Sequence, residues 1–189
     1  MDNYYTNPII FIMTMIVSFF QFILIMRFLF EINKVNFYNP ICQFVVKITN
    51  PILNPFRVLP LNIGQIDLFI IIIIVLITAL KIYIPYSFSS FDFGLNTLII
   101  VSFGKFIQDV LNIYWFLIII SAIGSWFHVF NNHPMFIVID ELCSPLYNVV
   151  RNYLPPLSGL DFSPIIILVM LKLTEMIIIP PIFNLAQNL

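Results

Sequence analysis

Long runs of apolar residues alternate along this chain with shorter segments in which polar and apolar residues share a helical spacing. The long runs predict transmembrane helices, because about 20 mostly apolar residues are needed to cross the hydrocarbon core of a membrane. Polar residues interrupt each run only sparsely, as Gln21 and Arg27 do in the first. The predicted spans are residues 9–30, 67–84, 106–130 and 162–182.

The stretch between the second and third spans has a different character. Its apolar run from Leu95 to Phe103 is too short to cross a membrane, and Gly104 and Lys105 follow it. We therefore interpret residues 86–105 as an interfacial connector, and a fifth span is the alternative.

Two amphipathic segments begin at Pro40 and Pro134. In each, apolar side chains recur at helical spacing on one face and polar side chains occupy the other. Each segment is too polar to span a membrane and too apolar to leave it. Both should lie in the interface or fold back partway into the protein. The prolines that interrupt them are Pro51, Pro55, Pro145 and Pro155.

These segments belong to an internal repeat, because matching residues recur at one spacing along the chain. Pairs 94 positions apart are Pro40 and Pro134, Pro51 and Pro145, Arg57 and Arg151, and Asp67 and Asp161. One inserted residue places Pro60 and Pro155, and Gly64 and Gly159, 95 positions apart. The predicted fold is an all-α membrane protein: four transmembrane helices in two tandem helix–amphipathic segment–helix repeats. The units are residues 1–85 and 106–189, joined by the connector.

The repeat also predicts an orientation in the membrane. Each unit contributes two spans, so both repeat loops share one side. Those loops hold more positive residues than the opposite side does, which favours cytoplasmic repeat loops and places both termini outside. The positive residues of the loops are Lys34, Lys47, Arg57 and Arg151, against Lys105 and the helix-end Lys81 on the other side.

Composition supports a membrane location and excludes several function classes. Hydrophobic residues make up 61% of the chain and charged residues 9%, whereas a soluble domain is about a quarter charged. A net charge of −1 without a basic run gives no direct nucleic-acid partner.

Cys42 and Cys143 form no C-x-x-C pair, so we expect inert buried thiols and no metal site. The N-terminal segment has no basic region typical of a cleaved signal, so the first span is predicted to be retained.

The repeated motifs resemble the YggT family of small bacterial membrane proteins, which is related to the YlmG proteins of chloroplasts. The two copies here read NFYNPICQFVVKITNPILNPFRVLPLNIGQID and SPLYNVVRNYLPPLSGLDFSP. The family often has adjacent arginines before the proline, whereas only Arg57 and Arg151 are present here. In the second copy the motif continues after Asp161 through Phe-Ser-Pro and so includes Ser163 and Pro164. The first copy has Leu-Phe-Ile after Asp67 at these positions.

The resemblance implies a multi-pass protein of the bacterial inner membrane with no established biochemical activity. It associates the chain with tolerance of osmotic stress and with compensation for impaired potassium uptake. It also implies partners among membrane or cell-division proteins, and it leaves a homo-oligomer open.

The first interpretation of Asp67 and Asp161 is helix capping, since each residue precedes a span and can accept hydrogen bonds from the free N–H groups at its start. An ion or proton site is the alternative. For Arg57 and Arg151 we favour anchoring to lipid headgroups, and pairing with the nearby aspartates is the alternative.

Lys172 and Glu175 lie three residues apart within the fourth span, where charge is costly. Neutralisation on one helix face is the first interpretation and a conduction site the second. Asp140 and Glu141 are interpreted as a solvated face. Small residues predict a helix-packing seam in the third span; they are Ser121, Ala122, Gly124 and Ser125.

The chain has no nucleophile elbow, P-loop or dinucleotide-binding fingerprint, so we expect no catalytic residues, cofactor or enzymatic activity. The favoured function is a non-catalytic membrane protein that organises membrane or partners at the cytoplasmic face. The alternative is a channel or transport accessory for potassium or another small osmolyte.

Overall fold

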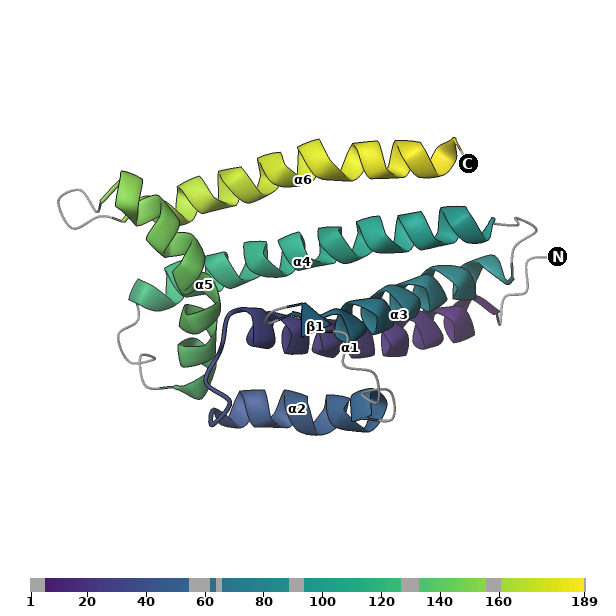
Figure 1. Cartoon of the computed structure of the whole chain (residues 1–189), viewed down its shortest axis with the longest axis horizontal. Helices are drawn as coiled ribbons and strands as arrows, with labels where there is room; N and C mark the ends of the chain where they lie inside the picture. The colour runs from purple at the N-terminus through teal and green to yellow at the C-terminus, as the bar shows by residue number, and fades with distance from the viewer. Residues whose placement is uncertain are drawn as a thin grey trace.

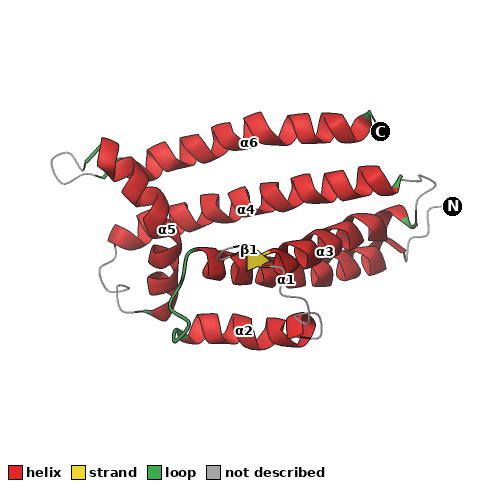
Figure 2. Cartoon of the chain, viewed as in Figure 1, coloured by secondary structure: helices red, strands yellow, loops and turns green. Residues whose placement is uncertain are grey.

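The computed structural model describes residues 6–54, 62–63, 66–88, 94–126, 133–155 and 161–188. Most of these residues are helical (Figures 1 and 2). Four helices are long and apolar enough to cross a membrane: α1 (Thr6–Ile32), α3 (Leu68–Tyr86), α4 (Leu95–Trp126) and α6 (Ser163–Gln187). The predicted all-α membrane fold with four transmembrane helices is confirmed.

The third span is longer than predicted, because α4 begins at Leu95 rather than at residue 106. The interfacial connector is therefore wrong for residues 95–105, which extend this span and form no fifth one. Gly104 does not break the helix but lies against α6. A methyl group in its place would be 2.8 Å from Cε1 of Phe183. In the sequence, a glycine at a close helix contact looks the same as a helix break.

Two further spans extend beyond their predicted ends at residues 84 and 182, and each contains proline. The helix α6 continues through Pro180 and Pro181 to Gln187, and α3 includes Pro85. A proline removes one backbone hydrogen bond and normally kinks or ends a helix. In hydrocarbon no water can satisfy an unfolded backbone, so the helix persists around the proline.

The two amphipathic segments form α2 (Pro40–Leu53) and α5 (Pro134–Tyr153). Each has its proline in the first turn, where a missing N–H costs nothing. The side chain of Asn39 accepts a hydrogen bond from the N–H of Ile41 at 2.9 Å, and His133 caps α5 in the same way. The starts of both segments agree with the sequence prediction.

The two helices are placed differently, although they occupy equivalent positions in the repeat. In Figure 1, α5 runs across the ends of α4 and α6, whereas α2 folds back along α1. Lys34, with φ of 54°, turns the chain in the left-handed region between α1 and α2. The Nδ2 atom of Asn39 donates to the carbonyl oxygen of Pro134 at 2.8 Å and ties the starts of α2 and α5 together. Equivalent positions in the repeat therefore do not lead to equivalent placements of the two helices.

A short antiparallel pair precedes α3 and was not predicted. The strands β1 (Asn62–Ile63) and β2 (Ile66–Asp67) pair Asn62 with Asp67 and Ile63 with Ile66. This pair leads directly into α3, whose first residue follows Asp67.

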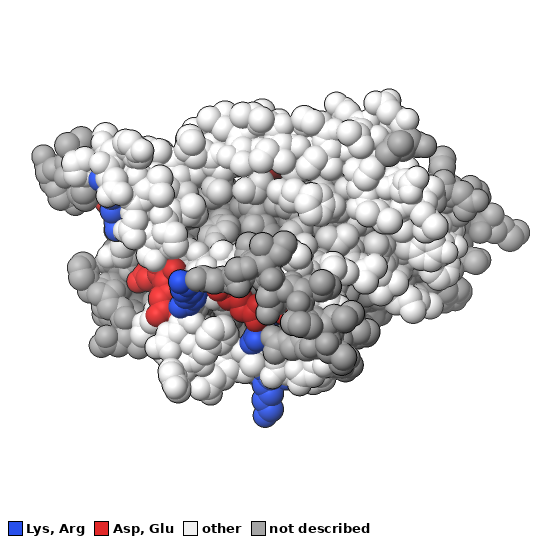
Figure 3. Space-filling view, in the orientation of Figure 1, with Lys and Arg blue, Asp and Glu red and all other residues white. Residues whose placement is uncertain are grey.

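The core lies where α1, α3 and α4 pack together, and it is apolar. Leu24, Ile74 and Ile118 are fully buried, and the rings of Phe28 and Phe106 lie 5.6 Å apart in an edge-on arrangement. The outward faces of the long helices are also apolar and exposed, as expected of a lipid-facing surface. In Figure 3 the charged side chains gather mainly toward the end at which α5 lies.

Candidate functional site

A buried glutamine near the middle of α1 is the centre of a polar network among three spans. The side chain of Gln21 is only 2% exposed. Its Nε2 atom donates to Oγ1 of Thr78 on α3 and to Oδ2 of Asp109 on α4, each at 2.8 Å. Its Oε1 atom accepts from Nζ of Lys81 at 2.9 Å. Both ends of this one amide are used, so Gln21 joins α1 to both α3 and α4.

Lys81 and Asp109 complete this network with opposite charges. Nζ of Lys81 lies 3.9 Å from Oδ2 of Asp109, and about a third of each side chain is exposed. Charged residues within spans usually face the helix bundle and pair with one another, as these two do. The pair connects the second span of the first repeat to the first span of the second.

Sequence reasoning missed this network. It treats Gln21 as an interruption of a span and Lys81 as a helix-end charge, and it does not single out Asp109. A usable signal was present, because Gln108 and Asp109 stand side by side in a largely apolar span. A carboxylate there requires a cation or donor from another helix.

A second network connects α4 to α6. Nζ of Lys172 donates to Oε2 of Glu175 at 2.7 Å, as their spacing on one helix face predicts. The other oxygen, Oε1, accepts from Nε2 of Gln108 on α4 at 2.9 Å. Oε1 of Gln108 in turn accepts from Lys105 at 2.9 Å. Glu175 is thus satisfied from two helices.

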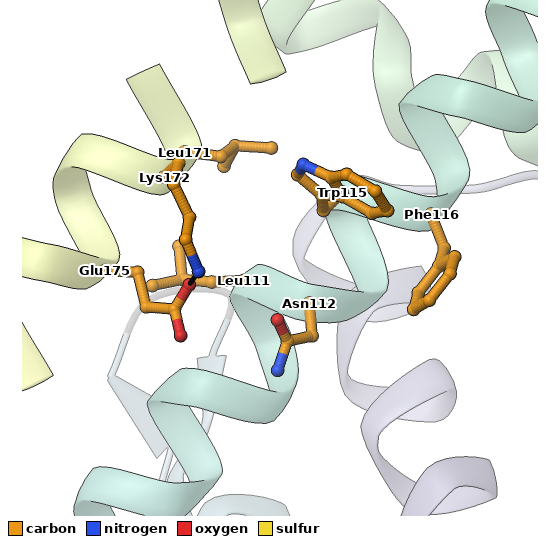
Figure 4. A pocket seen from close by; sticks show the side chains of 7 residues that line it. All are labelled: Leu111, Asn112, Trp115, Phe116, Leu171, Lys172 and Glu175. Carbon is orange, nitrogen blue, oxygen red and sulfur yellow. Dashed lines mark hydrogen bonds and ion pairs between the residues drawn. The ribbon is translucent and has the colours of Figure 1, made fainter. Parts of the chain in front are cut away.

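This second network borders a hollow of about 410 Å³ between α4 and α6 (Figure 4). Lys172 and Glu175 extend into it from α6, and Asn112 and Trp115 line it from α4. The side chain of Lys172 is 61% exposed. The groove therefore presents charge on the outer surface of the helix bundle.

The two networks occupy equivalent places in the repeat. At the 94-residue spacing, Thr78 corresponds to Lys172 and Lys81 corresponds to Glu175. Neighbouring residues of α4 serve both networks, since Asp109 contacts Gln21 and Gln108 contacts Glu175. The duplication has thus kept a polar layer near the middle of the spans while exchanging the residues in it.

The motif aspartates cap the spans that follow them, which confirms the first interpretation of these residues. Oδ1 of Asp67 accepts from the N–H of Phe69 at 3.0 Å, and Oδ1 of Asp161 accepts from the N–H of Ser163 at 2.8 Å. Both bonds satisfy free donors at a helix start.

Arg151 pairs with Asp161, although anchoring to lipid is the interpretation favoured from the sequence. Its Nε donates to Oδ2 at 3.1 Å and Nη2 makes a second, shorter bond, while the guanidinium lies 4.7 Å above the ring of Tyr147. Burial acts to raise the pKa of Asp161, but hydrogen bonds from Ser163 and Arg151 hold it below its ordinary value. The pair ties the end of α5 to the start of α6.

The remaining motif residues are only partly described. Pro51 and Pro145 lie inside α2 and α5, Pro155 is exposed after α5, and Pro164 is in the first turn of α6. The residues that lie outside the described ranges are Pro55, Arg57, Pro60, Gly64 and Gly159.

The cluster of small residues in α4 is a packing seam, but its partner is α5 rather than another span. A methyl group at Gly124 would lie 2.5 Å from Cε1 of Phe136. Ser121 is buried, and its Oγ donates to Oδ1 of Asp140 on α5 at 3.4 Å. Burial raises the pKa of Asp140 above its ordinary value, and the bond from Ser121 opposes this. Small side chains on α4 thus let α5 lie close across its end.

The two cysteines are buried and unreactive in character. Burial raises the pKa of Cys42 to about 11 and that of Cys143 to about 12, so both thiols remain protonated at neutral pH. Among the described residues, no three His, Cys, Asp or Glu side chains are grouped as a metal site would require. The polar groups near the membrane centre are instead held by one another.

Comparison with known proteins agrees with the duplicated architecture. The family model described as CCB3/YggT matches the chain twice, at residues 6–88 and 100–182. An uncharacterized protein of Pseudomonas aeruginosa is 33% identical over 172 residues, covering 90% of this chain and 87% of its own length.

Two further relatives extend the comparison. The uncharacterized protein YggT of Escherichia coli is 29% identical over 171 residues, covering 90% of this chain and 88% of its own. YlmG homolog protein 2, chloroplastic, of Arabidopsis thaliana is 38% identical over 66 residues, covering 34% and 25%. No solved structure matches the chain. With two matched repeats that together cover most of its length, the chain belongs to the CCB3/YggT family.

Proposed function

We propose that this protein is a non-catalytic, multi-pass protein of the bacterial inner membrane that organises partner proteins at the cytoplasmic face. The observation that carries the proposal is a polar stripe on the outer face of α5. Its members recur every four residues and are all exposed: Ser144, Asn148 and Asn152. Because residues four apart share one helix face, these side chains form one continuous row.

The anchoring of α5 supports this role. Its opposite face is buried through Val138, Leu142 and Tyr147, and the pair of Arg151 with Asp161 ties its end to α6. A helix held on one face and polar on the other can present a fixed surface to water. The spans thus hold α5 in a fixed position.

Charge supports placing this surface in the cytoplasm. Lys34, Lys47 and Arg151 are exposed and belong to the two repeat loops. The start of α1 and the end of α6 lie toward the opposite end of the bundle (Figure 1). The positive-inside rule then favours a cytoplasmic α5. By family resemblance, the partners bound there contribute to tolerance of osmotic stress.

Site-specific photo-crosslinking in living cells tests the proposal. A photoreactive side chain at position 144 should give adducts with a defined set of proteins, whereas one at Leu185, exposed near the far end of α6, should not. The Asn148→Arg variant changes the polar stripe and leaves the charges of the spans unchanged. Loss of the adducts in this variant would show that the partner proteins bind the stripe. Identical adducts from positions 144 and 185, or adducts with lipid alone, would contradict the proposal.

A transport accessory is a second candidate, because charged side chains near the membrane centre lie on three of the four spans. Purified protein in liposomes should then move potassium, and Lys81→Ala and Lys172→Ala should alter the flux. Lys47→Ala, at an exposed position on α2, is the control. Flux no greater than in protein-free liposomes would remove this candidate and leave the first.

A further inference from the structure

Lys172 is placed where a charged side chain needs a partner surface. It lies nine positions after Ser163, the first residue of α6, and Glu175 lies midway between the ends of that helix. The ammonium group is held by Glu175 and therefore turns toward the helix centre rather than to the nearer end. Snorkelling would require the reverse direction. With 61% of this side chain exposed, lipid alone would leave a charge facing hydrocarbon.

The first repeat shows how an equivalent site is covered. Thr78 and Lys81 correspond to Lys172 and Glu175, and a third span, α4, packs over them. Asp109 of α4 brings the charge opposite to Lys81 and accepts from Gln21. In the second repeat, α6 packs against α4 and α5, and the groove at Lys172 stays open (Figure 4).

We propose that a second copy of this chain covers the α4–α6 groove, so that Lys172 of each copy lies against Glu175 of the other. The two copies pack side by side about a two-fold axis along the membrane normal. Each copy supplies one cation and one anion at nearly the same depth. The four charges of the paired copies sum to zero, and each lysine gains a second carboxylate.

The surface around these charges suits such a contact. Exposed apolar side chains line the face of α6 above and below Lys172, among them Val169, Leu173 and Met176. Phe116 of α4, which is 60% exposed, borders the same groove. A two-fold interface uses one patch twice, so the patch must be self-complementary. A patch with one lysine, one glutamate and an apolar rim meets that condition.

A charge-reversal experiment tests this proposal. Copies with two different tags are co-expressed, and their co-purification from mild detergent is measured. Wild-type copies should associate. Lys172→Glu copies present only acids and Glu175→Lys copies only lysines, so either variant should associate with itself at least tenfold less. When the two variants are mixed, the acidic and basic patches are complementary, and association should return.

Recovery in the mixture shows that both variants are folded, so a loss with either alone cannot be ascribed to misfolding. Lys47→Glu, on the exposed face of α2, should associate as the wild type does. Counting photobleaching steps of labelled protein in liposomes should give two copies. One copy per particle, wild-type association by either variant, or no recovery in the mixture would overturn the proposal. So would recovery of a different protein in place of the second copy.

Discussion

Gln21 and Asp109 lie 88 positions apart in different repeats, yet the amide of Gln21 donates to the carboxylate of Asp109 at 2.8 Å. This bond connects the first spans of the two repeats. It also orients the carboxylate toward Lys81, whose ammonium group is bound by the other end of the same amide. Gln21 is therefore the residue on which the arrangement of the first three spans depends most directly.

The substitution Gln21→Leu should destabilise the protein by about 1–3 kcal/mol, since it leaves Asp109 and Lys81 without their shared partner. Hydrogen bonds between membrane helices are individually worth about 0.6 kcal/mol, which places single losses at the lower end. Unfolding in mixed micelles with increasing SDS measures the change. Gln43→Leu, at an exposed glutamine of α2, is the control and should have little effect. Equal effects of the two variants would contradict the role given to Gln21.

Lys81 and Asp109 should be energetically coupled. Lys81→Met leaves the carboxylate of Asp109 without its cation, and Asp109→Leu leaves the ammonium group of Lys81 without its anion. The double variant removes both charges. We expect the double variant to be more stable than the sum of the single losses predicts, with a coupling of about 1 kcal/mol. A double-mutant cycle in the same unfolding assay measures it. If the losses of stability in the two single variants were additive, Lys81 and Asp109 would not attract each other measurably across their 3.9 Å separation.

The close contact between α4 and α5 at Gly124 should not tolerate a side chain. A Cβ atom there would lie 2.5 Å from Cε1 and 2.9 Å from Cδ1 of Phe136, so the ring and α5 must shift. Gly124→Ser should cost about 1–3 kcal/mol, as overpacking typically does.

Gly94→Ser is the matched control for this variant. Among the residues that the structure describes, a Cβ at Gly94 meets only Oγ1 of Thr97, at an ordinary 3.6 Å, and serine suits the start of a helix. This variant should be neutral or slightly stabilising in thermal unfolding followed by tryptophan fluorescence. If Gly124→Ser were equally harmless, α5 would not be held as closely to α4 as the structure has it.

Elements that depend on local pattern could be predicted from the sequence. Apolar length gave the four spans, and proline after a capping side chain gave the starts of α2 and α5. The duplicated aspartates were correctly expected to cap helices, because a cap needs only neighbours in the chain. The boundaries of α4 and α6 were predicted wrongly for two different reasons. Gly104 marks a close contact with α6 and not a helix break. Prolines end a helix less readily in hydrocarbon, where no water can satisfy an unfolded backbone.

Contacts between distant residues could not be predicted in the same way. The network around Gln21 depends on which faces of α1, α3 and α4 meet, and the periodicity of a uniformly apolar helix does not define a face. The pairing of Arg151 with Asp161 depends on how the end of α5 lies relative to the start of α6, which the local pattern of either helix does not define. The equivalence of the two polar layers became visible only when both were located in space.

The Arg151–Asp161 pair should make stability depend on pH in the acidic range. The lowered pKa of Asp161 means that the folded state binds its proton less readily than the unfolded state. Stability from this pair is therefore complete above the ordinary carboxyl pKa of 3.8 and is lost as the pH falls through the lowered value. Arg151→Leu should shift acid unfolding to higher pH, measured by circular dichroism. Asp161→Asn keeps an oxygen for the cap and should remove this part of the pH dependence, so a wild-type acid profile in both variants would contradict the assignment.

The two cysteines should be silent toward thiol reagents while the protein is folded. Cys42 and Cys143 have no exposed surface, and burial raises their pKa values to about 11 and about 12. A raised thiol pKa keeps the neutral form up to alkaline pH, and the neutral thiol is a poor nucleophile. A membrane-permeant maleimide should therefore label the native protein at least tenfold more slowly than the SDS-unfolded protein, in which both thiols react. A cysteine introduced at the exposed Ser144 is the positive control. Rapid labelling of the native wild type would show that α2 or α5 opens from the spans, and mass spectrometry would identify which helix does so.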